Sequence, residues 1–416
     1  MVNKFLSSIV KLGKDATNKW NQTDADMEAF NSHMKICKFF SSSMGLWPQQ
    51  SKLTQKLISI FVWLTLTSFF IPLLLSIKNI KGNLDMLIPW LANFFGLIAG
   101  ACSYANACNN RKKIKLFISK MKNDWLNCES TSEYEIMLEN ASLNNNLIKV
   151  QLVLYCAAML KYISEPIIPL FLDIIIPLDE SRPRKLIAEA NYLVDADDTF
   201  NFIVISINEI HVTVAAVVIT MTVDTIFIFS AYHACGQLQI LGYKFKNLVN
   251  ADYNVAFSDK RDTQKEIKFC IKMHKSTIMF INDFNDCFSI PLFLNLGLTM
   301  LMMSLAGVQF VTKLDNLGEA FTMMSYTIGQ ICRLFCLTLP SQRLIDQSNE
   351  LFQNIYDSYW YTLPSDSKTL VKTVMLRCLI PNSFTAGKLY CFSMSNFVTV
   401  IKTAVSYITV LLSIRE

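Results

Sequence analysis

Three stretches of the chain consist of apolar and small polar residues without a single charge. They cover residues 57–77, 86–108 and 287–312, and each is 21 residues or longer. A helix rises about 1.5 Å per residue, so about 20 apolar residues are enough to cross the hydrocarbon core of a bilayer. Each stretch is therefore predicted to be a membrane-spanning helix.

Four further apolar stretches, 150–178, 200–232, 320–340 and 389–413, contain isolated charges. Only helices and closed barrels satisfy their backbone hydrogen bonds inside a bilayer, and the alternating pattern of barrel strands is absent. We therefore predict an all-α membrane protein with seven transmembrane helices. Asp224 and Arg333, on two of these helices, are placed to pair.

Apolar residues recur at helical spacing between the spans as well. Ile267, Cys270 and Ile271 begin a run of such residues, three or four apart, that ends at Ile281. We predict that the helices around 200–232, 287–312 and 320–340 continue beyond the membrane and pack there as an anchor bundle. A further helix is predicted over 367–380 and is ended by Pro381.

These patterns divide the chain into six predicted parts. They are an N-terminal segment 1–56, a bundle of four helices 57–232, a connecting region 233–286, two helices within 287–340, a second connecting region 341–388, and a last helix with a short tail 389–416.

The distribution of positive charge predicts the orientation. Of the 38 Lys and Arg residues, 28 fall on the N-terminal segment and on alternate connections. Positive charge stays in the cytoplasm, so the N-terminus is predicted to be cytoplasmic and the C-terminus extracellular. None of the 12 cysteines falls in the predicted extracellular loops, so reduced thiols are expected. The glycosylation sequons at Asn21 and Asn140 lie on the predicted inner side and are expected to be unused.

Composition agrees with a membrane protein and gives no sign of an enzyme. The chain is 52% apolar and 17% charged, with a mean hydropathy of +0.32, whereas about a quarter of the residues of soluble domains are charged. No Gly-rich phosphate loop or nucleophile elbow is present, and the four histidines are scattered. We expect no catalysis, metal or other cofactor. The net charge of +5 is explained by the cytoplasmic loops, so no nucleic-acid partner is expected.

The last predicted helix carries a narrow polar stripe. Its members recur every three or four residues, within about 40° of the direction of Val410: Asn396, Thr399, Thr403, Ser406, Val410 and Ile414. An uncharged, hydroxyl-rich stripe closed by two aliphatic side chains is typical of a pore helix with a hydrophobic gate. Small polar residues also mediate close helix packing in membranes, and the pattern alone favours that interpretation.

A family resemblance shifts the balance toward the pore. The segments Phe384-Thr-Ala-Gly-Lys-Leu-Tyr, Phe397-Val-Thr-Val and Ser406-Tyr-Ile-Thr-Val-Leu-Leu are similar to the C-terminal signature of insect odorant receptors. Asp224-Thr, His233-Ala-Cys-Gly and Ile240-Leu-Gly-Tyr resemble hymenopteran members. No single motif is specific, but together with the length and seven spans the resemblance covers essentially the whole chain.

This resemblance implies a subunit of a heterotetrameric, non-selective cation channel in the cell membrane of olfactory sensory neurons. The partners implied are odorant coreceptor subunits, a small volatile ligand and the lipid bilayer. The gate positions of the family fall on Val410 and Ile414, and Thr399, Thr403 and Ser406 line the pore below them. The chain lacks the long cytoplasmic insertion of the coreceptor, so it resembles a ligand-tuning subunit. Lys402, a cation about 80° from the stripe, is a departure that puts a pore-facing position in doubt.

The resemblance also implies that regions 233–286 and 341–388 are anchor regions, in which cytoplasmic extensions of the last four helices form the anchor bundle. It further implies that 57–232 is the ligand-binding bundle and where the ligand binds. The odorant pocket of the family is enclosed by the outer halves of the second, third, fourth and sixth helices. In this chain those positions are Trp90, Phe94, Tyr162, Glu165, Ile205, Glu209, Met324 and Ile328. Each aromatic residue also fits ordinary helix packing, and Lys161 and Glu165 are spaced to neutralise each other.

Three alternatives share some of these features. Gustatory receptors have the same fold and topology but typically a different ending of the last helix. A G-protein-coupled receptor typically carries Asp-Arg-Tyr and Asn-Pro-x-x-Tyr motifs, and neither Asp-Arg nor Asn-Pro occurs in this sequence. A transporter is expected to show internal repeats with paired broken helices, and no repeat is evident.

Overall fold

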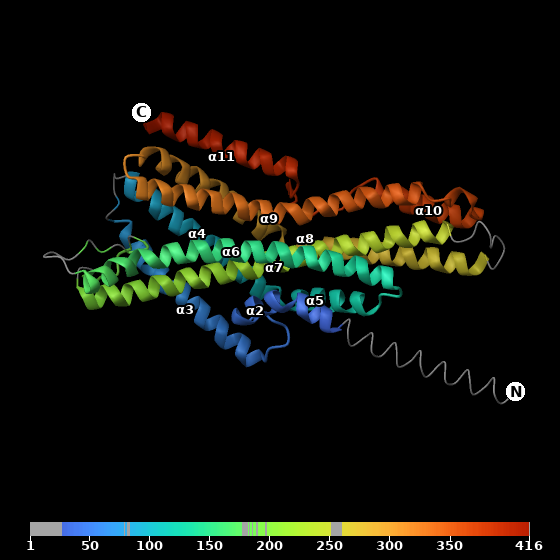
Figure 1. The fold of residues 1–416 in the computed structure, drawn as a ribbon, viewed down its shortest axis with the longest axis horizontal. Coiled ribbons are helices and arrows are strands. Elements are labelled where there is room, and N and C mark those ends of the chain that lie inside the picture. Colours follow the sequence, from blue (N-terminus) through green and yellow to red (C-terminus); the bar gives the residue numbers. More distant parts are fainter. Residues whose placement is uncertain are drawn as a thin grey trace.

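The computed structural model describes residues 27–415 apart from 79, 81–83, 177–181, 183, 185, 189, 196–197 and 251–259. The described chain is almost entirely helical (Figure 1). Its elements are α2 Lys35–Ser43, α3 Lys52–Ser76, α4 Leu84–Asn109, α5 Arg111–Leu126, α6 Thr131–Ile175, α7 Thr199–Asn250, α8 Lys260–Thr312, α9 Leu317–Tyr356, the short 3-10 helix η1 Trp360–Thr362, α10 Ser365–Cys378, β1 Thr385–Ala386, β2 Tyr390–Cys391 and α11 Met394–Arg415.

Six of the helices are long and apolar enough to cross a membrane, namely α3, α4, α6, α7, α8 and α11. The remaining predicted span, 320–340, corresponds to α9, which has 40 residues. Gln330 and Arg333 lower its mean hydropathy, because both side chains are strongly polar. The all-helical fold expected from the pattern of apolar residues is confirmed.

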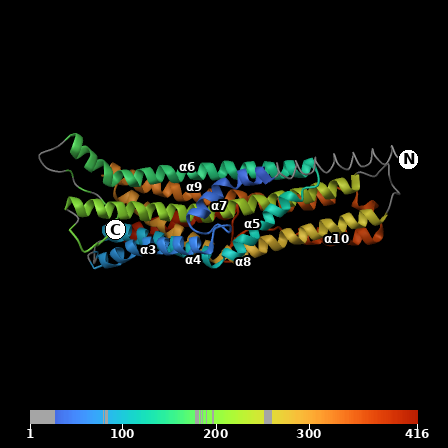
Figure 2. The ribbon, with the colours of Figure 1, turned by 90° about the horizontal axis from the view of Figure 1, so that it is seen from below.

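Four long helices run through the molecule from end to end. Helices α6, α7, α8 and α9 contain 45, 52, 53 and 40 residues, about twice the length that a bilayer requires. Figures 1 and 2 show them side by side, with α3, α4 and α11 along one half and α10 at the other end. Helices α7, α8 and α9 thus continue past their spans, as predicted, and α6 does so as well, which was not predicted.

Helix α7 forms the centre of this arrangement. It packs against α6, α8 and α9 and also against α2, α3 and α4, and every residue from Met221 to Leu238 is buried. An aromatic cluster joins its middle to the rest of the core, with Phe227 5.4 Å from Phe384 and 5.4 Å from Phe392 between ring centroids. Because the apolar residues of α7 surround the helix on all sides, the pattern fits an element buried in the centre of a bundle.

A short hairpin precedes α11 and was not predicted from the sequence. Strands β1 and β2 pair in antiparallel register, with Ala386 opposite Tyr390. Gly387 turns the chain at φ +62°, and its amide donates to the Ser289 carbonyl of α8 at 2.8 Å. The last span was predicted to begin at residue 389, but α11 begins at Met394, because the intervening apolar residues pack in the hairpin.

Candidate functional site

The aromatic residues predicted to line the ligand pocket on α4 are packed against each other. The rings of Trp90 and Phe94 are stacked 5.0 Å apart, and Phe94 is also stacked on Phe70 of α3 at 6.3 Å. The indole N–H of Trp90 donates to the carbonyl of Leu73 at 2.7 Å, and Trp90 is 7% exposed. The structure therefore brings these two predicted residues together at the contact of α3 and α4.

Charged and aromatic side chains also meet on α6. Lys161 Nζ lies 3.2 Å from a carboxylate oxygen of Glu165 and 4.9 Å from the ring centroid of Tyr162. Tyr162 and Glu165 are both half-buried. The pairing of Lys161 with Glu165 that their spacing indicates is thus present, and it neutralises the one carboxylate that was predicted here as a ligand contact.

Glu209 of α7 contacts the connection between α6 and α7. Its carboxylate accepts hydrogen bonds from the backbone N–H of Ile187 at 2.8 Å, from that of Ala188 at 3.4 Å and from the hydroxyl of Tyr192 at 3.3 Å. Glu209 is 2% exposed, and Ile205, one turn earlier, is 4% exposed. In this arrangement the carboxylate binds the connecting loop, a partnership that the sequence did not indicate.

The predicted residues of α9 lie nearer the surface of the subunit. Met324 is 39% exposed and Ile328 49% exposed. Between them, Tyr326 has a buried hydroxyl without a hydrogen-bond partner among the described residues. Buried hydroxyls are nearly always paired, so Tyr326 is a polar candidate that the sequence analysis missed.

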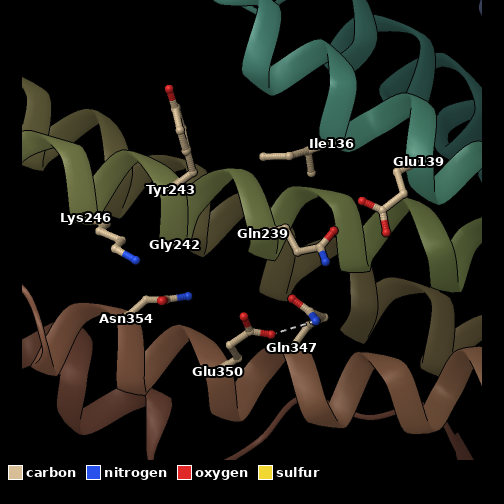
Figure 3. A pocket seen from close by; sticks show the side chains of 9 residues that line it. All are labelled: Ile136, Glu139, Gln239, Gly242, Tyr243, Lys246, Gln347, Glu350 and Asn354. Atoms are coloured by element: carbon tan, nitrogen blue, oxygen red, sulfur yellow. Dashed lines mark hydrogen bonds between the residues drawn. The ribbon is translucent and has the colours of Figure 1, made fainter.

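None of the eight predicted ligand residues lines either of the two cavities recorded among the described residues. The larger cavity, about 230 Å³, lies between α6, α7 and α9 (Figure 3). Its walls are polar, and Gln347 donates to Glu350 there at 2.8 Å. Such residues resemble an ordinary hydrated surface in the sequence, so no signal marked this cavity. It is lined by Ile136, Glu139, Gln239, Gly242, Tyr243, Lys246, Gln347, Glu350 and Asn354.

The predicted pore stripe lies on the open face of α11. The opposite face packs on α8, where Val400 is 4% and Ala404 2% exposed. Thr399 and Ser406 are exposed, Thr403 is half-buried, and Val410 is 52% exposed. Ile414 belongs to α11, but its side chain lies outside the described residues. Lys402 is exposed beside the stripe.

The hydroxyl groups of the stripe are satisfied within α11 itself. Thr399, Thr403 and Ser406 donate to carbonyls one turn earlier, at 3.1, 2.8 and 3.0 Å. Because these hydroxyl groups already have hydrogen-bond acceptors, they need none from another helix of the subunit. The stripe therefore presents a mildly polar, uncharged surface.

A buried ion pair joins α7 to α9, as the sequence indicated for Asp224 and Arg333. Arg333 Nε and Nη2 donate to the two carboxylate oxygens of Asp224 at 2.9 and 2.8 Å. From α6, Gln151 Nε2 donates to the same carboxylate at 2.6 Å and the Tyr155 hydroxyl at 3.3 Å. Asp224 is fully buried. Three helices thus meet at one carboxylate.

Comparison with known proteins identifies the class of this chain. The family model for the 7tm Odorant receptor matches residues 92–405. Odorant receptor 13a of Drosophila melanogaster is 21% identical over 397 residues, which cover 88% of this chain and 90% of that protein. The odorant receptor coreceptor of Ooceraea biroi is 28% identical over 153 residues, covering 36% of this chain and 31% of the coreceptor.

Solved structures share the fold. The insect olfactory receptor OR5 from Machilis hrabei in complex with eugenol superposes with a TM-score of 0.77 at 14% identity, covering 94% of this chain and 100% of that chain. The structure of the same receptor described without eugenol gives a TM-score of 0.72 at 15% identity, with the same coverage. The TM-scores establish the seven-helix fold. Because the sequence identity is this low, the likeness to these structures shows the fold alone.

Proposed function

Because the chain belongs to the 7tm Odorant receptor family, we propose that it is the odorant-tuning subunit of a heteromeric, odorant-gated, non-selective cation channel. The observation that carries this proposal is the placement of α11. One face of α11 packs on α8 and α9, while the stripe of Thr399, Ser406 and Val410 is left open. A helix that lines a pore shared between subunits needs such a free, uncharged face.

Coreceptor subunits are the proposed partners in the channel. Part of this chain is similar to odorant receptor coreceptors. This similarity supports the proposal that the two kinds of subunit have related contact surfaces. The end of the molecule away from α3 and α4, where α10 lies, also exposes apolar side chains, and Leu376, Leu379 and Ile380 are 61–67% exposed there. Exposed apolar patches mark interaction sites, which supports assembly through the predicted anchor regions 233–286 and 341–388.

The proposed ligand is a small, largely apolar volatile molecule. The relative from Machilis hrabei is described in complex with eugenol, a phenolic volatile. Here, the eight predicted positions combine aromatic and aliphatic walls with the carboxylates Glu165 and Glu209, which already have partners. Affinity would therefore come mainly from apolar burial. We place this receptor in the membrane of olfactory sensory neurons, with its N-terminus cytoplasmic.

Recording of odorant-evoked current tests the proposal directly. The chain is expressed in oocytes with and without an insect coreceptor and exposed to a fixed panel of volatile alcohols, esters and phenols that includes eugenol. We expect inward cation current with at least one volatile, dependent on both subunits. If the chain reaches the surface with the coreceptor but none of the volatiles evokes a current, the proposal is refuted.

Trp90 provides the residue-level test of the ligand site. Trp90→Ala is expected to raise the half-maximal odorant concentration about thirty- to hundredfold, because loss of an indole wall costs about 2–3 kcal/mol. Trp63→Ala is the matched control, since Trp63 of α3 is 39% exposed and packs edge-on against Tyr104, away from the predicted pocket. An unchanged concentration–response curve for Trp90→Ala would assign Trp90 to packing alone.

A further inference from the structure

The Asp224–Arg333 pair is costly where it stands. Asp224 is fully buried, and the Arg333 side chain is 16% exposed, within helices that span the membrane. Removing two charges from water carries a large desolvation penalty, and an apolar pair of equal volume is often as stable. Ionisable residues at membrane depth therefore point to function, and this pair lies outside both the predicted ligand wall and the predicted pore stripe.

Toward α6, the contacts of the pair lead to the helices of the predicted ligand site. Tyr155, whose hydroxyl donates to Asp224 at 3.3 Å, is seven residues before Tyr162 on α6. Seven residues are about two helical turns, so the two tyrosines lie on one face of that helix. On α9, Arg333 follows Ile328 by five residues. Any shift of α6 against α9 at the ligand level therefore acts on the hydrogen bonds around Asp224.

In the other direction, the contacts of the pair lead to the start of the predicted pore helix α11. Arg333 lines a cavity of about 20 Å³ together with Phe392, which ends the hairpin that precedes α11. Phe335, two residues after Arg333, lies 5.7 Å from Phe397 in the first turns of α11 between ring centroids. The pair thus lies between the helices of the predicted ligand site and the start of α11.

The same cavity lies beside the guanidinium and has room for about one water molecule. Asn295, Thr299 and Gln330 contribute polar residues to its lining. A bidentate pair is directional, so a small displacement of α7 against α9 favours either the present geometry or one in which a guanidinium N–H turns from Asp224 toward a water molecule in the cavity. Two discrete arrangements are what an element that couples distant sites requires.

We propose that Asp224 and Arg333 form a switchable joint that transmits ligand-induced movement of α6 and α7 to the start of the pore helix α11. Arg333 is a positioning residue in this scheme, and Gln151 and Tyr155 are the contacts through which α6 acts on the joint. The inference rests on the proposed channel function, because it concerns how that channel opens.

Paired neutral substitutions separate coupling from stability. Asp224→Asn or Arg333→Gln alone leaves one buried charge without its partner, which destabilises the fold. The double variant D224N/R333Q leaves none, so it is expected to reach the surface. Tyr155→Phe removes one hydroxyl and keeps the ring. The matched control is Arg343→Gln, because Arg343 also pairs across α9 and α6, with Glu139 at 3.3 Å, but that pair is exposed.

Each variant is expressed with the coreceptor, and surface density and odorant concentration–response are measured with eugenol and with the most potent volatile of the panel. We expect D224N/R333Q to raise the half-maximal concentration about tenfold at normal surface density, and Tyr155→Phe about threefold, within the range of known coupling energies. Arg343→Gln is expected to match the wild type.

Unchanged concentration–response curves for both D224N/R333Q and Tyr155→Phe would show that the pair only stabilises the fold. In that case the wild-type current still supports the proposed channel. Absence of any wild-type current with the coreceptor would remove the channel and the joint together, so the two failures are distinguishable.

Discussion

Asp124 of α5 shows how a single side chain fixes a peripheral helix to the core. Its carboxylate lies 3.1 Å from Nε2 of His233 on α7 and 3.1 Å from Nζ of Lys120. Lys120 in turn donates to Ser276 of α8 at 2.8 Å. Burial alone raises the pKa of Asp124, but the hydrogen bond from His233 and the charge of Lys120 together outweigh it and hold that pKa below its ordinary value.

The sign of this shift determines the pH dependence. A depressed carboxyl pKa contributes stability that is present above the ordinary value and is lost as the pH falls through the depressed one. Asp124→Asn is therefore expected to cost about 2 kcal/mol at neutral pH, with a smaller difference once the pH falls below the ordinary value of an aspartate carboxyl. Thermal unfolding of the detergent-purified chain measures the stability difference at neutral and at acidic pH. The exposed Asp315→Asn is the control, and a difference that stays constant with pH would contradict the assignment.

At the scale of elements, α11 carries the gate prediction. Val410 and Ile414 are four residues apart and lie on one face of the helix. A ring of such side chains blocks ions because water leaves the constriction. Val410→Asn is expected to increase ligand-free current, although only partly, since the proposed coreceptor subunits would contribute their own gate residues.

Leu411→Asn is the matched control, because Leu411 points about 100° away from Val410. Both variants need equal surface density with the coreceptor. If Val410→Asn has the basal current, ion selectivity and odorant response of the wild type, the stripe of α11 serves helix packing.

The hairpin before α11 depends on one glycine. Gly387 has φ +62°, and a Cβ there would lie 2.8 Å from the side chain of Phe293. Gly387→Ala is therefore expected to destabilise the hairpin by about 1–3 kcal/mol and to lower the amount of channel at the surface. Gly100→Ala in α4 is the control, since a Cβ at that position would face open space. Equal surface density of both variants would show that the hairpin tolerates a side chain.

Elements differed in how far the sequence predicted them. Span α3 was visible because a membrane helix needs about 20 apolar residues in succession, and the expected stretch 57–77 agrees closely with Lys52–Ser76. The hairpin has two residues in each strand, too few for an alternating pattern to emerge. Its position is set instead by tertiary contacts with α8, where Gly387 and Lys388 hydrogen-bond to Ser289.

At the scale of the whole molecule, the orientation in the membrane remains a prediction from charge. The sequon at Asn140 cannot test it, because Asn140 is 2% exposed and its amide donates to Gln239 of α7 at 2.5 Å. A glycan is sterically excluded there in either orientation. Only the structure showed this, since a buried amide and an exposed one are identical in sequence.

Cysteine labelling gives a sharper test of orientation. A membrane-impermeant maleimide applied outside intact cells is expected to label Asp315→Cys, in the connection between α8 and α9, and to leave Thr369→Cys of α10 unlabelled. Both positions are exposed, and the wild-type chain gives the background from its native thiols. Labelling of Thr369→Cys but not Asp315→Cys would reverse the orientation and remove the proposed extracellular gate.

The surroundings of the predicted ligand residues were the least predictable part of the molecule. The sequence placed Glu209 and Trp90 within helices, but the partners of both side chains lie on other elements, the α6–α7 connection and the Leu73 carbonyl of α3. The Asp224–Arg333 pair could be anticipated because unpaired charges are costly inside a membrane. Tyr326 could not, since a tyrosine in an apolar span looks the same whether its hydroxyl is paired or free.

The buried centre of α7 also bears on how receptors of this kind diversify. Every residue from Met221 to Leu238 is enclosed by neighbouring helices, and changes of even one methylene group are felt in such close-packed surroundings. Substitutions there carry a stability penalty whatever odorant is sensed. New ligand preferences can therefore arise mainly in the outer turns of the helices, where a changed side chain alters the ligand wall and leaves the shared framework intact.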